Sequence, residues 1–309
     1  MKKNRINNIA GLTLIEILIG VVISSMMMAA MYTTYNVVNN SYSQVSDKAK
    51  ISRAGRDIVG MLMRDIRMAG FHYDFGTNAL DISTTSYLQY VGYDSTIEES
   101  HDPIIVLEQT LGYNSGKEDG FIGIDRHNDE DPCCDRIHIV YGDFNQNDLD
   151  QPYKKYKITY YALPREEGDD KYYGVFKTKQ SWIQTVGDTT GEWSDDCSEC
   201  YADPGQLIRD HLYDMEFIVF DREGRKLYNT TSNSYPRPDN ASRKDLYNIR
   251  AIDVRLTFRS KKEFFRKEAT AEKPRFVKAL GNRSRIFMDK YLRDSIVVTV
   301  HTRNVGEGY

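Results

Sequence analysis

The motifs that identify many enzymes are missing from this chain of 309 residues. It contains no H-E-x-x-H metalloprotease motif, no phosphate-binding P-loop, no G-x-S-x-G nucleophile turn and no G-x-G-x-x-G dinucleotide motif. The formal net charge is only −4, and the lysines and arginines look scattered rather than clustered, so there is no signature of nucleic-acid binding. We therefore expect neither an enzyme, including a signal-anchored envelope enzyme, nor a nucleic-acid partner.

Proline is scarce, and none of the eight prolines lies between Tyr32 and Met68. No internal repeat or long Gly/Ser/Pro linker occurs either. Gly55 and Gly60 each weaken a helix by ~1 kcal/mol relative to alanine, and Gly70 is a natural stop. Apolar residues recur in this part of the chain at spacings of three and four, which predicts an amphipathic helix: Ile51, Ala54, Ile58, Leu62, Ile66 and Ala69.

Charge is almost absent from residues 12–31, which read LTLIEILIGVVISSMMMAAM and hold one charged residue in twenty. At ~1.5 Å per residue a helix of this length spans roughly 30 Å, the thickness of the hydrocarbon core of a bilayer. Lys2, Lys3 and Arg5 precede the run without an acidic residue, which favours an N-terminus on the cytoplasmic side. No small-residue cleavage site follows the run, in contrast to a secretory signal peptide.

Glu16 is the single charge in this run. A carboxylate in an apolar membrane segment costs a few kcal/mol, and such residues usually serve a function. The alternative is that Glu16 lies close enough to the helix end to reach the membrane interface. The two interpretations remain open on physical grounds alone.

The residues G-L-T-L-I-E at 11–16 resemble the class III signal of type IV prepilins, usually G-F-T-L-x-E. The resemblance implies that a prepilin peptidase cleaves after Gly11 and methylates the new N-terminal residue, Leu12, which replaces the usual Phe. It also implies that the apolar helix stays in the membrane until the subunit enters a filament, where Glu16 pairs with the terminal amine of a neighbour. The segment D-I-R-M-A-G-F at 65–71 resembles the end of that helix in PilW-type minor pilins.

Strand patterns follow the helix. Residues 72–135 predict several short strands with long loops, and after them stretches rich in β-branched and aromatic residues predict strands at 137–141, 156–161, 215–220, 249–258 and 296–300. In the fourth of these, apolar Ile252, Val254, Leu256 and Phe258 alternate with polar Asp253, Arg255 and Thr257, which predicts a half-buried antiparallel strand. The order of these strands also resembles PilW-type minor pilins and the pseudopilins of type II secretion.

Together these features predict an α+β, pilin-like fold in three parts: a leader (1–11), a long N-terminal helix (12–70) and a β-rich head (71–309). The resemblance implies a minor pilin that helps to initiate, cap or modify a type IV pilus, held in the inner membrane with its head in the periplasm before assembly and extracellular afterwards. Its expected partners are other pilin subunits, the prepilin peptidase, the inner membrane and the pilus assembly platform. The alternatives are a type II secretion pseudopilin, and a tip adhesin with recognition loops at 72–135 and 164–206.

Cysteine is rare, and an exported head would meet an oxidising compartment in which disulfides form. The four cysteines allow three pairings, and the sequence does not choose between a long-range bridge and two local bonds. A long-range bridge would close a loop of about 65 residues, for which the chain-entropy model gives ~4 kcal/mol. A zinc site is less favoured than disulfides because adjacent cysteines do not easily bind one tetrahedral ion. The candidates are Cys133, Cys134, Cys197 and Cys200.

Carboxylate and amide side chains are dense in the loop between the strands predicted at 137–141 and 156–161. Asp143, Asn145 and Asn147 have the D-x-[DN]-x-[DN] spacing that opens calcium-binding loops, and Asp148 or Asp150 would have to supply the remaining charge. The chain departs from an EF-hand because Asp148 replaces the expected glycine. The alternative is a turn that needs no ion, since Asn and Asp favour turns. Calcium is therefore the one cofactor that the sequence suggests.

Overall fold

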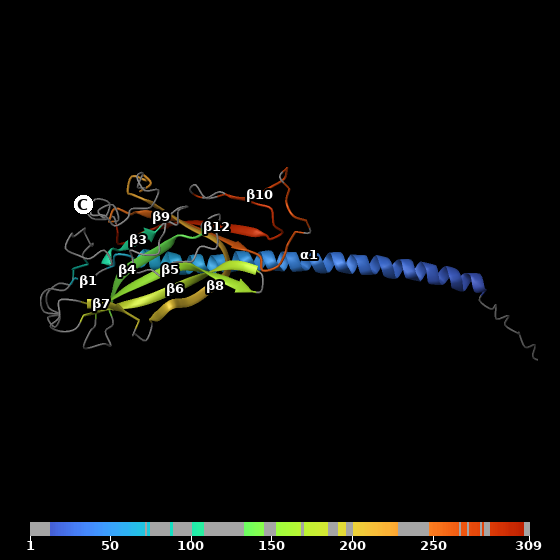
Figure 1. The fold of residues 1–309 in the computed structure, drawn as a ribbon, viewed down its shortest axis with the longest axis horizontal. Coiled ribbons are helices and arrows are strands. Elements are labelled where there is room, and N and C mark those ends of the chain that lie inside the picture. Colours follow the sequence, from blue (N-terminus) through green and yellow to red (C-terminus); the bar gives the residue numbers. More distant parts are fainter. Residues whose placement is uncertain are drawn as a thin grey trace, which may run out of the picture. The chain divides into compact units, whose positions relative to one another are not determined.

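The computed structural model describes residues 13–71, 73–74, 87–88, 101–107, 133–144, 153–167, 170–184, 191–195, 200–227, 247–265, 267–270, 272–278, 280 and 285–305. The chain forms two compact units, Met1–Ala49 and Lys50–Tyr309, which we call the N-terminal unit and the head unit. The boundary lies inside helix α1 (Leu14–Met68), so this one helix contributes residues to both units (Figure 1).

The strands in the described part of the head unit are all paired in antiparallel fashion. The largest sheet among these residues has the order β12-β9-β8-β6-β5-β4-β3, with β7 paired to β6, while β1–β2 and β10–β11 form two separate pairs. In chain order the strands are β1 (Tyr73–Asp74), β2 (Tyr87–Leu88), β3 (Ile104–Leu107), β4 (Arg136–Phe144), β5 (Tyr153–Glu167), β6 (Asp170–Gln184), β7 (Gly191–Ser194), β8 (Tyr201–Phe220), β9 (Ala251–Arg259), β10 (Arg275–Val277), β11 (Arg285–Phe287) and β12 (Arg293–His301).

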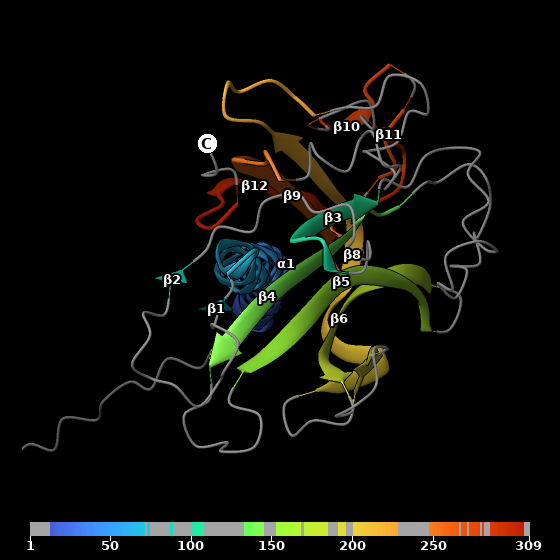
Figure 2. The ribbon, with the colours of Figure 1, turned by 90° about the vertical axis from the view of Figure 1, so that its left-hand side faces the viewer.

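The core of the head unit lies between the sheet and the part of α1 that follows Lys50 (Figure 2). The predicted apolar stripe is the buried face of this helix, except that the side chain of Ala54 lies outside the described part. Full burial of an Ile or Leu side chain contributes about 1.5–3 kcal/mol, so these residues supply much of the free energy that holds the helix on the sheet. The buried apolar side chains of this stripe and beside it are Ile51, Ile58, Val59, Leu62, Ile66 and Ala69.

The predicted helix and all five predicted strands are present, and β1, β2 and β3 supply short strands within 72–135. The interpretation of residues 164–206 as recognition loops is wrong for most of that stretch. Residues 170–184 form β6, which pairs with β5 and β8, and 191–194 form β7. The sequence pattern did not predict β6, because its many polar residues give no clear hydrophobic periodicity. Its strand conformation depends instead on pairing with a strand on each side.

Strand β9 differs from the prediction on one face. Its apolar face packs in the core as expected, but Arg255 and Thr257 on the other face are 1% and 0% exposed. The strand lies between β8 and β12, and acidic residues of β8 and the backbone of Lys278 cover the arginine. In this alternating strand, the polar residue Arg255 therefore belongs to a buried ion pair and not to a face exposed to solvent.

The two helix glycines have different surroundings, which leads to a prediction. A Cβ atom at Gly55 would collide with Ile296 and contact Phe258, whereas one at Gly60 would meet nothing within 4 Å. We expect Gly60→Ala to raise the free energy of unfolding by about 0.5–1 kcal/mol through helix propensity, and Gly55→Ala to give no such gain. Chemical denaturation of the two variants measures this; equal gains would mean that Gly55 does not mediate the close approach of α1 to β12.

Candidate assembly site

The first turn of α1 holds the one charged residue of the apolar segment. Thr13 precedes the helix, and Glu16 is its third residue. The Glu16 carboxylate accepts hydrogen bonds from the backbone N–H and the hydroxyl of Thr13, both at 2.9 Å, and the Thr13 hydroxyl accepts one from the Glu16 N–H at 3.4 Å. This is a capping box, which satisfies donors that a helix start leaves without partners. The T-x-x-E spacing signals it, although the sequence reading considered only the charge of Glu16.

The N-terminal unit exposes a continuous apolar surface beyond this turn. By length and composition α1 can cross a membrane. Each of its large apolar side chains up to Met31 is between 43% and 81% exposed, a state that water disfavours and that lipid or other helices would relieve. These side chains are Leu14, Ile15, Ile17, Leu18, Ile19, Val21, Val22, Ile23, Met26, Met27, Met28 and Met31. The predicted cleavage residues Gly11 and Leu12 lie outside the described residues.

In the head unit, a polar contact anchors α1 to the sheet. Asp65 is only 4% exposed, and its carboxylate receives Lys177 Nζ of β6 and the Tyr160 hydroxyl of β5, both at 2.6 Å. Burial and the neighbouring Asp65 charge raise the pKa of Tyr160 well above its usual value, so its hydroxyl stays protonated and donates. Sequence analysis missed this contact, although Asp65 follows Leu62 by three residues and so shares the buried face.

A second buried charge cluster lies on the other face of the sheet, around Arg255. Its guanidinium donates to Glu216 at 2.9 Å, to Asp214, to the Thr257 hydroxyl at 3.1 Å and to the carbonyl of Lys278 at 3.1 Å. Asp214 and Glu216 are themselves 1% and 5% exposed. The guanidinium of Arg255 thus connects β9 to β8 and to the chain that follows β10.

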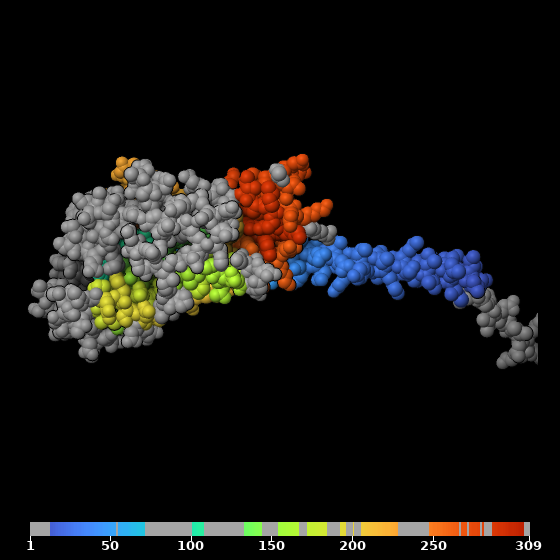
Figure 3. Space-filling model, in the orientation of Figure 1, coloured from blue at the N-terminus to red at the C-terminus, as the bar shows by residue number. Residues whose placement is uncertain are grey.

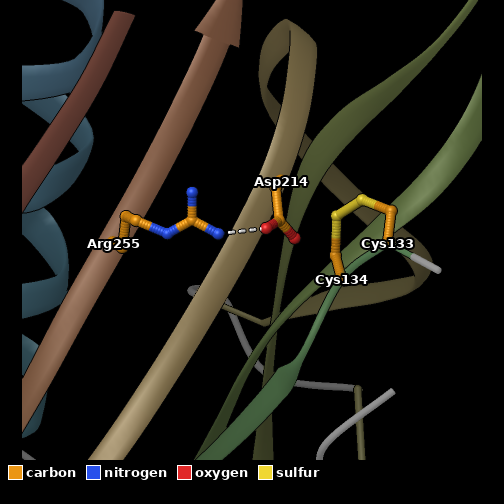
Figure 4. The surroundings of a disulfide bond; sticks show 4 residues. All are labelled: Cys133, Cys134, Asp214 and Arg255. Carbon is orange, nitrogen blue, oxygen red and sulfur yellow. Dashed lines mark hydrogen bonds and ion pairs between the residues drawn. A yellow bond between two sulfur atoms is a disulfide. The ribbon is translucent and has the colours of Figure 1, made fainter. Parts of the chain in front are cut away.

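Beside this cluster lies the Cys133–Cys134 disulfide (Figure 4). The structure therefore has a bond between adjacent cysteines, not the long-range bridge that would have closed about 65 residues. Cys200 is also disulfide-bonded, and Cys197 lies outside the described residues. The two buried sulfurs and an Asp214 carboxylate oxygen lie within 4.8 Å of one another, close enough to hold a metal ion. While the sulfurs are bonded to each other neither is a thiolate, so the group lacks the ligands that zinc requires.

The predicted calcium loop is only partly within the described structure. Asp143 is exposed near the end of β4 and is paired in register with Lys154 of β5, so the strands continue to the edge of the loop. Asn145, Asn147, Asp148 and Asp150 lie outside the described residues. Calcium binding here stays a prediction.

Both tryptophans of the chain meet on the sheet. Trp182 of β6 and Trp193 of β7 pack edge to face at 5.3 Å, and His101 lies 4.3 Å and 5.2 Å from the two rings. Lys157 Nζ lies 4.6 Å above Trp193, and burial lowers the pKa of this lysine to about 8. The rings contact one another, which supports a packing role for them rather than stacking on a ligand.

Comparison with known proteins gives one family match. The model described as the prokaryotic N-terminal methylation motif matches residues 6–32. No curated protein matches the chain. A solved structure, the type IV-like pilin TTHA1219 from Thermus thermophilus, is 7% identical over 83% of this chain and 98% of its own, with a TM-score of 0.36.

The chain therefore has a prepilin-type methylation motif on an apolar helix, followed by an antiparallel sheet. In these features it is type IV pilin-like. A motif of this kind is a substrate of prepilin processing, and the apolar helix is suited to membrane anchoring.

Proposed function

We propose that this protein is a minor pilin of PilW type, a structural subunit that helps to initiate, cap or modify a type IV pilus. The observation that carries the proposal is the methylation motif at 6–32 on a helix whose apolar side chains are exposed. The peptidase cleaves between Gly11 and Leu12 and methylates Leu12. The inner membrane holds the subunit with its head in the periplasm until the assembly platform adds it to the extracellular filament. Its mechanism is assembly, not catalysis.

The test of this proposal has two measurements. Mass spectrometry of the mature protein should give a chain that starts at N-methylated Leu12, and sheared filaments should contain that chain. A mature chain that starts beyond Met31 would show an ordinary secretory signal and would contradict the proposal. A correctly processed chain that is absent from pili, with type II secretion genes as neighbours, would assign it to the pseudopilin alternative.

Glu16 gives a prediction that separates charge from helix capping. Glu16→Gln keeps a capping box but removes the charge, because Gln serves in this motif as well as Glu. We expect the variant to insert into the membrane normally and to enter sheared filaments at about one tenth of the normal level or less. The estimate follows from the contribution of a hydrogen bond to a charged group, about 1.5–3 kcal/mol. Quantitative immunoblotting of membranes and filaments measures both.

The matched control is Thr13→Val, which removes the hydroxyl contacts of the cap and leaves the carboxylate in place. It should assemble near the normal level, since capping contributes only about 0.5–2 kcal/mol to a helix that the membrane already supports. Normal assembly of Glu16→Gln, with loss in Thr13→Val, would show that Glu16 serves only as a cap.

A further inference from the structure

The connection between β9 and β12, residues 260–292, has a charge unlike that of the rest of the chain. It holds ten Lys and Arg and four Asp and Glu, a net charge of +6 in 33 residues, while the whole chain has −4. The sequence-based statement that basic residues are scattered is therefore wrong for this segment. We call residues 260–292 the basic connection; in Figure 3 the orange and red C-terminal residues form one block of surface.

Strands β10 and β11 form a hairpin within the basic connection, and this hairpin exposes apolar side chains. The cross-strand partners Phe276 and Ile286 share one face and are 64% and 58% exposed. Met288, two residues after Ile286, is 40% exposed. On the opposite face Val277 is buried, and Phe287 packs on the guanidinium of Arg293 at 4.0 Å. The hairpin thus fixes one face on the head and presents an apolar one outward.

The same connection also carries exposed lysines. Lys262, Lys267, Lys273 and Lys278 are all exposed. Arg275 donates to the carbonyl oxygens of Lys267 and Asp289 and stacks on Phe265 at 3.8 Å. Backbone carbonyls hold this guanidinium in place without cancelling its charge. A surface that combines exposed apolar side chains with lysines is typical of segments that lie on anionic membranes.

The basic connection leaves the sheet at the end where α1 enters the head unit. Gly55 faces Ile296 near the start of β12, whereas Gly70 faces Val305 beyond its end. The connection begins after Arg259, the last residue of β9, and ends before Arg293, the first residue of β12. This paired position is farther along the strands from Gly70 than Ile296 is. In the chain, helix residues 32–49 connect this end of the head unit to the apolar segment. Within the head unit, the basic connection therefore lies at the end that follows the apolar segment in chain order.

We propose that the face formed by Phe276, Ile286 and Met288, together with the exposed lysines of the basic connection, docks on the anionic lipid surface of the membrane while the subunit is anchored there. This inference rests on the membrane-anchored state of the proposed function. The lysines attract anionic headgroups, and the apolar side chains enter the interface between headgroups and acyl chains. Docking would restrict the head relative to the bilayer before the subunit leaves for the filament.

The test uses the full chain with one introduced thiol, Phe276→Cys, which carries an environment-sensitive dye. Every cysteine in the described part of the chain is disulfide-bonded, which favours labelling of the new thiol. The protein is reconstituted in phosphatidylcholine vesicles with or without phosphatidylglycerol, and spin-labelled lipid is the quencher. We expect quenching that depends on phosphatidylglycerol, that weakens in high salt and that falls at least about fivefold in a Lys267→Gln, Lys273→Gln, Lys278→Gln variant.

The control label is Arg222→Cys, in the exposed turn after β8 at the other end of the strand ladder, which should not be quenched. Equal quenching at both positions, or no effect of lipid charge, would overturn the inference. A label that responds only to added duplex DNA or to co-reconstituted pilin subunits would assign this face to those partners and also overturn it. Flotation under alkaline conditions separates the two proposals: a chain that fails to insert contradicts membrane anchoring itself, while an inserted chain without quenching contradicts only the docking.

Discussion

Asp65→Ala should lower the free energy of unfolding of the head by about 3–5 kcal/mol. The substitution leaves the Lys177 ammonium, in a side chain that is 7% exposed, without the carboxylate at 2.6 Å, and it removes the acceptor of the Tyr160 hydroxyl. A buried charge without its partner carries most of this cost. For a unit of this size the melting temperature should fall by roughly 6–20 °C. Thermal unfolding of the detergent-solubilised protein measures the change.

The control on the same helix is Asp57→Ala, because Asp57 is exposed. It should change the stability by no more than about 0.5 kcal/mol. The double variant Asp65→Leu, Lys177→Met removes both charges and should recover most of the loss, since buried ion pairs can often be replaced by apolar residues at little cost. The single variants Asp65→Leu and Lys177→Met complete the cycle. A double variant that loses as much stability as these two single variants added together would show that Asp65 and Lys177 are not energetically coupled.

Arg255→Met is the second substitution with a large expected effect, again about 3–5 kcal/mol. It removes the donor of four hydrogen bonds and leaves two carboxylates, those of Asp214 and Glu216, buried beside each other without the cation. Arg255→Lys should recover only part of the loss, because an ammonium is a point charge that lacks the fork of five donors. Urea denaturation of the solubilised variants gives the free energies.

Arg222→Met makes the same chemical change at an exposed turn residue and should be nearly neutral. Full stability of Arg255→Met would contradict the proposed role of the cluster. Full stability of Arg255→Lys would show that charge, and not the geometry of the guanidinium, is what the cluster needs.

Local patterns predicted the elements of the fold well where each element has one buried face. The stripe from Ile51 to Ala69 is the buried face of α1. The turn after β8 also follows from its residues: Asp221 accepts a hydrogen bond from the Arg225 N–H at 2.7 Å, and Gly224 has a φ of 75°. Both depend on residues a few positions apart, which a sequence displays directly.

Sequence patterns did not predict burial or strand conformation where a contact with a residue distant in the sequence decides it. Nothing near Arg255 in the sequence shows that Glu216, 39 residues away, makes its side of β9 a buried face. Asp65 and Lys177 are 112 residues apart, so their contact follows from the position of α1 on β6. The strand β6 was missed for the same reason, since its polar residues are ordered by β5 and β8.

By itself, the sequence determined the N-terminal signal, the apolar helix and the order of the main strands, because each depends on residues close together in the chain. Only the tertiary structure decided which charges are buried, that Cys133 bonds to Cys134, and that the basic connection presents Phe276 and Ile286 on one outward face. These features arise from packing between distant segments. A charged side chain costs little free energy in water, but once it is buried the fold depends on its partner.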